Sequence, residues 1–99
     1  MLVHTVIFYL RNDLSEAQKE EFHKGLESLR PIKTAQALYI GKPAAVAPRP
    51  VVDSSFSFSI TAIFADEEAH NAYQVDPLHV AFLDQFRSYW SRVQIYDAD

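Results

Sequence analysis

The chain has 99 residues, a length typical of one domain, and we predict a single domain over residues 1–99. Hydrophobic residues make up 48% of it, enough for one packed core, and the absence of cysteine excludes disulfides and thiolate chemistry. The net charge of -4 and the lack of a Lys/Arg cluster argue against a nucleic-acid partner. The apolar segment near the start is too short to span a bilayer and has no basic leader, so we expect a soluble, cytoplasmic protein with no membrane partner.

The first two predicted elements are a strand and a helix. Residues Leu2–Leu10 (LVHTVIFYL) are β-branched and aromatic, and both faces of this strand are largely apolar. The helix begins at Ser15, which forms a capping box with Gln18, and it ends before Pro31. Gly25 falls near the inner face of this helix. A glycine there indicates either close packing against the sheet or room for a ligand.

Two further strands are predicted on either side of a proline-rich loop. The weaker strand pattern covers Thr34–Gly41, and the loop covers residues 42–55, which hold three of the five prolines. A loop of this length indicates a lid, a partner contact or a segment without function. Residues Ser55–Ala65 alternate between an aromatic and aliphatic face and a face of serine and threonine, which is the strongest strand pattern in the chain.

The last part of the chain is predicted to form two helices and a closing strand. Asp66 caps a short helix over residues 67–75, and Asp76-Pro77 ends that helix and starts another. The second helix has an apolar stripe, formed by Phe82, Leu83, Phe86 and Trp90. Residues Val93–Tyr96 form the closing strand.

The predicted order is β-α-β-β-α-β, which is the ferredoxin-like α+β fold with a four-stranded antiparallel sheet and helices on one face. The other face would then be bare, and in the first strand it would present Val3, Ile7 and Tyr9. An exposed apolar face usually marks an interface, so we predict a homodimer that packs sheet to sheet as a dimeric α+β barrel. The serines and threonines of the third strand would make part of that interface polar.

Three polar side chains are predicted to meet at one end of an apolar cavity. His79 lies on the apolar stripe of its helix, His4 shares a strand face with Val6 and Phe8, and Tyr73 lies on the inner side of the preceding helix. An apolar cavity with a few convergent polar groups is the usual form of a small-molecule site. The candidate catalytic residues are His79, Tyr73 and His4, and the candidate substrate-binding residues are Phe8, Leu26, Phe58, Phe82 and Phe86.

The chemistry of these groups suits proton transfer. Burial and the start of a helix disfavour the charged form of His79, so we expect a neutral ring near pH 7, although Asp76 acts in the opposite direction. A neutral imidazole can take a proton from an acidic carbon, and a tyrosine hydroxyl can donate to the oxyanion that forms. The alternative is that His79 is a hydrogen-bonded core residue without chemistry. We expect His23 and His70 to be mostly solvated, and no motif predicts a metal site or a cofactor.

Several segments resemble the stress-responsive A/B barrel (Dabb) family over nearly the whole chain. They are VHTVIFYL, SEAQKEEFHKGLESL, AYQVDPLHVAF and FRSYW. The most specific pattern is Tyr-x-x-x-Pro-x-His-x-x-Phe, formed here by Tyr73, Pro77, His79 and Phe82. This resemblance implies a small dimeric α+β barrel.

The chain is also similar to a plant member of that family, a cofactor-free polyketide cyclase. This resemblance implies that His79 is the general base of an intramolecular aldol closure, assisted by Tyr73 and His4. Where that cyclase has a further histidine and a tyrosine, this chain has Phe58 and Leu26. The difference implies another substrate, or none.

Three functions remain open at this point. The first is a homodimer with an apolar small-molecule pocket and cofactor-free acid–base catalysis on a carbonyl-bearing, polyketide-like substrate, as a cyclase, lyase or isomerase. The second is a non-catalytic, stress-associated or structural dimer in which His79 only packs and caps. The third is a cofactor-free oxygenase or a haem-binding protein, as occurs among other dimeric α+β barrels.

Overall fold

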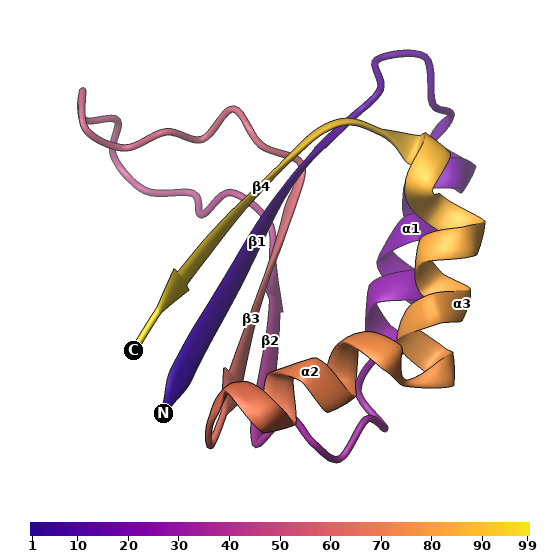
Figure 1. Cartoon of the computed structure of the whole chain (residues 1–99). Coiled ribbons are helices and arrows are strands. Elements are labelled where there is room, and N and C mark those ends of the chain that lie inside the picture. Colours follow the sequence, from indigo (N-terminus) through magenta and orange to yellow (C-terminus); the bar gives the residue numbers. More distant parts are fainter.

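A computed structural model of the chain describes residues 1–99 as one antiparallel sheet with helices on one side (Figure 1). The strands lie in the order β2-β3-β1-β4. The elements are β1 (Leu2–Leu10), α1 (Glu16–Glu27), β2 (Ala37–Gly41), β3 (Phe58–Phe64), α2 (Glu67–Val75), α3 (Pro77–Phe86), a 3-10 turn (Arg87–Tyr89) and β4 (Trp90–Ala98). This arrangement confirms the predicted ferredoxin-like β-α-β-β-α-β fold.

The helix starts follow the local signals in the sequence. The Ser15 hydroxyl accepts a hydrogen bond from the Gln18 backbone N–H at 3.1 Å, and the Gln18 side chain accepts from the Ser15 N–H at 2.8 Å. This reciprocal pair is the predicted capping box, and such a cap stabilises a helix by about 1 kcal/mol. The Asp66 carboxylate accepts from the Ala69 N–H at 2.9 Å and starts α2 in the same way.

Three strands differ in their bounds from the sequence-based prediction. β2 begins at Ala37, whereas the predicted strand began at Thr34. β3 begins at Phe58, three residues later than expected, so the loop between β2 and β3 extends through residue 57. β4 runs from Trp90 to Ala98 and is longer than expected, because it pairs with β1 along nearly the whole length of that strand. The loop projects away from the helices, beyond the opposite face of the sheet (Figure 1).

The core lies between the inner face of the sheet and the helices. Alternate residues of β1 and β3 point into it, and Phe22 of α1 packs at its centre with no exposed surface. The Phe22 ring lies 5.2 to 5.8 Å from the rings of Phe8, Phe58, Phe82 and Phe86. Burying one such side chain stabilises a fold by about 1.5–3 kcal/mol, so this aromatic cluster is a main source of stability.

Gly25 lies where α1 crosses α3. A Cβ atom at this position would overlap the ring of Phe86, a residue that is itself buried in the core. Of the two interpretations that the sequence left open, the structure supports close packing, but Gly25 packs against the ring of Phe86 on α3 and not against the sheet.

The outer face of the sheet carries no helix (Figure 1). One row across it consists of Tyr39, Thr61, Thr5 and Tyr96. The two tyrosines are 65% and 60% exposed, whereas the hydroxyls of Thr5 and Thr61 lie 3.3 Å apart. The face therefore mixes apolar and hydroxyl groups, as its sequence predicts. None of the helices is both long enough and apolar enough to cross a membrane.

Candidate active site

The corner between α2 and α3 explains the position of His79. Asp76 ends α2, and its carboxylate accepts a hydrogen bond from the Leu78 N–H at 2.9 Å, while Pro77 has no N–H to donate. In a continuous helix the Leu78 N–H would bond to the carbonyl of Gln74. Here that carbonyl is free, and it accepts a hydrogen bond from Nδ1 of His79 at 3.0 Å.

This hydrogen bond fixes the protonation pattern of the imidazole. A backbone carbonyl only accepts, so Nδ1 of His79 must carry the proton. In the neutral ring Nε2 then keeps its lone pair. Burial lowers the pKa of His79, while the hydrogen bond to Gln74 and the charge of Asp76 act in the opposite direction. The ring is therefore neutral near pH 7, with a basic nitrogen.

Tyr73 lies next to this ring. The centroids of the Tyr73 and His79 rings are 4.8 Å apart, and Tyr73 is 1% exposed. Its hydroxyl is buried and has no hydrogen-bond partner in the protein. Burial raises the pKa of Tyr73 to about 12, so the phenol stays protonated. An unpaired buried hydroxyl is rare and costs about 1–3 kcal/mol, which is the pattern of a group held for a ligand.

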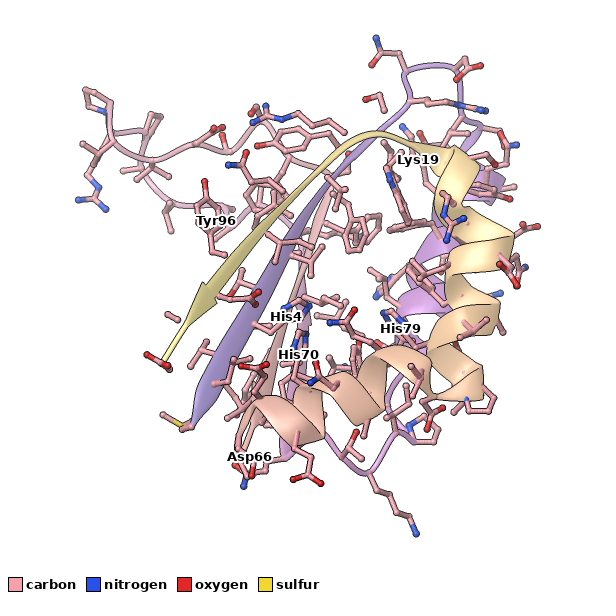
Figure 2. The ribbon with its side chains drawn as sticks, viewed as in Figure 1. His4, Lys19, Asp66, His70, His79 and Tyr96 are labelled. Carbon is pink, nitrogen blue, oxygen red and sulfur yellow. The ribbon has the colours of Figure 1, made fainter.

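His4 and His70 form a second pair beside the first. His4 stands opposite Asp97 across β1 and β4, and its Nδ1 lies 2.5 Å from a carboxylate oxygen of that residue. The His70 ring lies 4.5 Å from the His4 ring, and each residue is 7% exposed. Burial lowers the pKa of His70, and the neighbouring His4 lowers it further. Figure 2 shows His4, His70 and His79 in the space between the sheet and the helices.

A cavity of about 250 Å³ connects these polar groups. Its polar lining consists of His4, His70, Gln74, His79 and Asp97, and its apolar lining consists of Val6, Phe8, Leu83, Trp90, Val93 and Ile95. The cavity is open along β4, where the inward-facing Val93 and Ile95 are 39% and 52% exposed. It therefore offers an apolar wall on one side and imidazole groups on the other.

The structure brings the three predicted catalytic residues together, with one difference. The His4 and Tyr73 centroids lie 6.5 Å apart, and His4 and His79 both line the cavity, but Tyr73 does not line it. Of the five predicted substrate-binding residues, Phe8 alone lies on the cavity wall. Phe82 and Phe86 border a separate groove between α1 and α3, and Leu26 is fully buried in the core.

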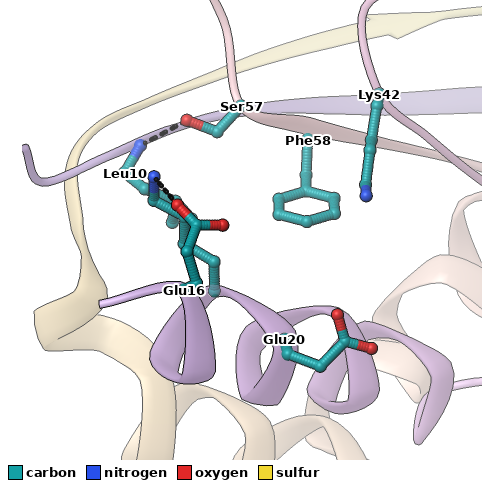
Figure 3. A pocket seen from close by; sticks show the side chains of 7 residues that line it. Leu10, Glu16, Glu20, Lys42, Ser57 and Phe58 are labelled. Atoms are coloured by element: carbon teal, nitrogen blue, oxygen red, sulfur yellow. Dashed lines mark hydrogen bonds and ion pairs between the residues drawn. The ribbon is translucent and has the colours of Figure 1, made fainter. Parts of the chain in front are cut away.

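Phe58 borders a different hollow, of about 300 Å³, between the start of α1 and the ends of β1 and β3 (Figure 3). The other side chains that line it are mainly charged, and Lys42 lies 5.5 Å from the centroid of the Phe58 ring. This hollow contains no histidine or tyrosine, so it lacks the groups that the predicted chemistry needs.

Two site residues were misplaced or missed by the sequence analysis. The prediction that His70 is mostly solvated is wrong, because α2 lays this residue directly on His4. His23 is partly exposed, as its 34% side-chain exposure shows. Asp97 was missed because the closing strand was expected to end at Tyr96. If the strand is continued past Tyr96, every second residue from Val93 faces inward, and Asp97 then lies on the inner face.

Comparison with known proteins agrees with this architecture. The Stress responsive A/B Barrel Domain family matches residues 2–99. Olivetolic acid cyclase from Cannabis sativa is 30% identical over 95 residues, which cover 95% of this chain and 91% of the cyclase.

Solved structures share the fold at lower identity. A dimeric ferredoxin-like protein of unknown function from Thermobifida fusca has a TM-score of 0.78 and 19% identity, covering 98% of this chain and 88% of that one. Hydroxynitrile lyase from Passiflora edulis has a TM-score of 0.78 and 14% identity, covering 98% and 90%. Because the family match spans nearly the entire sequence, the chain belongs to the stress-responsive A/B barrel domain family.

Proposed function

We propose that this protein is a homodimer that binds a carbonyl-bearing small molecule in the histidine-lined cavity and catalyses proton transfer on it without a cofactor. One observation carries this proposal. The hydrogen bond from His79 Nδ1 to the Gln74 carbonyl leaves Nε2 unprotonated at the edge of an apolar cavity. A neutral, partly desolvated imidazole is a suitable general base near neutral pH.

In the proposed reaction, Nε2 of His79 takes a proton from a carbon next to a carbonyl group. The electron pair of that C–H bond moves to the carbonyl oxygen, which becomes an enolate stabilised by a hydrogen bond from the Tyr73 hydroxyl. The enolate carbon then attacks a second carbonyl of the same molecule, and the imidazolium returns its proton to the new alkoxide. Tyr73 does not line the cavity, so its hydroxyl reaches a bound oxygen only if neighbouring side chains rearrange.

His4 and Asp97 support this chemistry from the opposite wall. Nδ1 of His4 donates a hydrogen bond to the Asp97 carboxylate at 2.5 Å, and this bond fixes the orientation of the imidazole. We assign His4 to the orientation of a substrate hydroxyl or enol, because it lines the same cavity as His79.

The cavity limits the size of the substrate. Its volume of about 250 Å³ lies just below the roughly 300–1,000 Å³ that is usual for drug-sized ligands. A compact ring-forming core fits inside, and an apolar tail can leave through the opening along Val93 and Ile95. The relative named olivetolic acid cyclase supports a polyketide-like substrate, and the fold shared with a hydroxynitrile lyase supports a lyase or cyclase reaction.

The proposed dimer uses the outer face of the sheet. The exposed Tyr39 and Tyr96 and the partly exposed Ile7 give this face an apolar character. The dimeric state of the Thermobifida fusca neighbour supports a dimer. A non-catalytic dimer remains the second candidate. It is favoured by the burial of Leu26, Phe58 and Phe86 in the core, because none of these predicted substrate-binding residues lines the histidine cavity.

The test uses proton exchange, which needs no knowledge of the natural substrate. A panel of 1,3-dicarbonyl compounds is incubated with the protein in D2O, and the exchange of their acidic C–H protons is followed by NMR. We expect the wild type to accelerate exchange and His79→Ala to lose at least about a hundredfold of that acceleration, the lower end of general-base effects. His23→Ala, a histidine on α1 outside the cavity, is the matched control and should behave as wild type. Wild-type exchange no faster than in imidazole buffer would contradict the proposal.

A further inference from the structure

We propose that His4, His70 and Asp97 form a binding site for a divalent transition-metal ion of the zinc class. The three residues come from β1, α2 and β4, and they face one another at the end of the cavity opposite to Leu83 and Trp90. This site goes beyond the proposed function, which needs no metal.

The geometry brings three suitable donors together. One ligand atom from each residue lies within 4.8 Å of the other two, and the His4 Nδ1 and Asp97 oxygen are already 2.5 Å apart. Around a bound zinc ion with bonds of about 2.0–2.2 Å, donor atoms stand roughly 3–3.5 Å apart. Binding therefore needs the His4–Asp97 pair to open by about 0.5–1 Å and His70 to approach by up to about 1.5 Å. The Asp97 side chain is 45% exposed, so it has freedom to turn.

Each of the two imidazoles has one hydrogen-bond partner in the protein, so one nitrogen of each ring is without a partner. The His70 ring forms a hydrogen bond with the Gln74 side chain at 3.2 Å, and His4 and His70 make no hydrogen bond to each other although their ring centroids are 4.5 Å apart. Polar groups that are 7% exposed usually have strong partners. An ion would replace the proton that His4 shares with Asp97 and would use a lone pair of His70.

The donor set indicates the class of ion. Two imidazole nitrogens and one carboxylate oxygen match the three-ligand sites of Zn²⁺ and its neighbours Co²⁺, Ni²⁺ and Cu²⁺. Mg²⁺ and Ca²⁺ prefer oxygen ligands in larger number, so we expect them to bind weakly. Three protein ligands leave a fourth position of the ion for water or a small molecule, and the ion would lie at the cavity that Gln74 and His79 also line.

The experiment measures binding of Zn²⁺ to the full, tag-free chain after treatment with a chelator and gel filtration, by titration calorimetry. The absorption spectrum of added Co²⁺ reports the coordination geometry. We expect one ion per chain and a tetrahedral cobalt spectrum. His70→Gln and Asp97→Asn should each weaken binding by at least about tenfold, the loss that even outer partners of a metal site cause.

Two control variants separate this site from others. His23→Ala removes a histidine that lies near Glu27 on α1 and should leave zinc affinity unchanged. His79→Ala should also keep zinc affinity while it loses proton exchange, so that failure of one proposal is distinguishable from failure of the other. Circular dichroism checks that His70→Gln is folded, and Asp97→Asn gives a second test at a half-exposed position. No zinc binding by the wild type, or wild-type affinity in both His70→Gln and Asp97→Asn, would overturn the proposal.

Discussion

Nδ1 of His79 donates to the backbone carbonyl of Gln74 across the corner between α2 and α3, at 3.0 Å. His79 is only half-buried, so replacing it should cost little beyond this one hydrogen bond. We expect His79→Ala to lower the free energy of unfolding by about 0.5–1.5 kcal/mol. Urea denaturation at fixed protein concentration measures this change. A loss of several kcal/mol would show instead that the ring is mainly structural.

The lowered pKa values of His70 and His79 make stability depend on pH. Both values lie below the ordinary 6.5, so in the unfolded chain each ring takes up a proton at a higher pH than in the folded protein. The unfolded state then binds more protons below about pH 6.5, and the folded state loses stability as the pH falls through that range. Above it, these two residues should cause no change. Urea denaturation from pH 7.5 to pH 5 tests this, and His70→Gln should flatten the curve.

The same shift sets the pH dependence of the proposed reaction. Catalysis requires the neutral form of His79, and its pKa is lowered by burial. The acid limb of the rate profile should therefore lie below pH 6.5, and the rate should be level above it until the substrate itself ionises. Exchange rates measured across this range check the expectation. A loss of rate that begins above pH 6.5 as the pH falls would contradict the assignment of a desolvated His79 as the base.

Tyr73→Phe should separate stability from activity. The Tyr73 hydroxyl is buried without a partner, so its removal relieves an unsatisfied polar group without leaving a large cavity. We expect the free energy of unfolding to stay equal or rise by about 1 kcal/mol. Proton exchange should fall by about tenfold or more if the hydroxyl stabilises the enolate. A variant that is strongly destabilised would indicate a hidden partner for this hydroxyl.

Gly25→Ala should destabilise the fold although alanine is the better helix former. The new methyl group would overlap the ring of Phe86, which is 3% exposed and has little room to move. Overpacking of this kind costs about 1–3 kcal/mol, against a gain of about 0.5–1 kcal/mol in helix propensity. Thermal unfolding measures the net loss. Gly25→Ser should behave alike, and Phe86→Leu should partly rescue Gly25→Ala.

The outer face of the sheet offers a test of assembly. Tyr96 is 60% exposed on the outer face of the edge strand β4, so Tyr96→Asp should place a charge in the proposed interface and shift the protein from dimer to monomer. Val80→Lys alters an exposed apolar residue of α3 and is the control. Light scattering coupled to gel filtration gives the mass of each. A wild-type protein that is monomeric at micromolar concentration would contradict the proposed dimer.

The sequence predicted the elements well because their signals are local. The capping box at Ser15 and the Asp76-Pro77 corner each act within a few residues. The site was harder, because His70 meets His4 through the tilt of α2 over the sheet, and Asp97 meets His4 through the register of β1 and β4. Neither contact leaves a periodic pattern. The sequence pattern placed the aromatic residues on the inner side of the sheet and helices, but it could not show which of them fill the core and which line the cavity.

The Asp76-Pro77 corner has a consequence for engineering and for variation among relatives. No backbone hydrogen bond joins Pro77 or Leu78 of α3 to the carbonyl of Gln74 in α2. The angle between the two helices can therefore change without breaking a backbone hydrogen bond of either helix. The imidazole of His79 moves with α3, whereas its carbonyl partner stays with α2. A few degrees of rotation at this joint would therefore lengthen or shorten one bond and so alter both the tautomer of the base and the width of the cavity mouth.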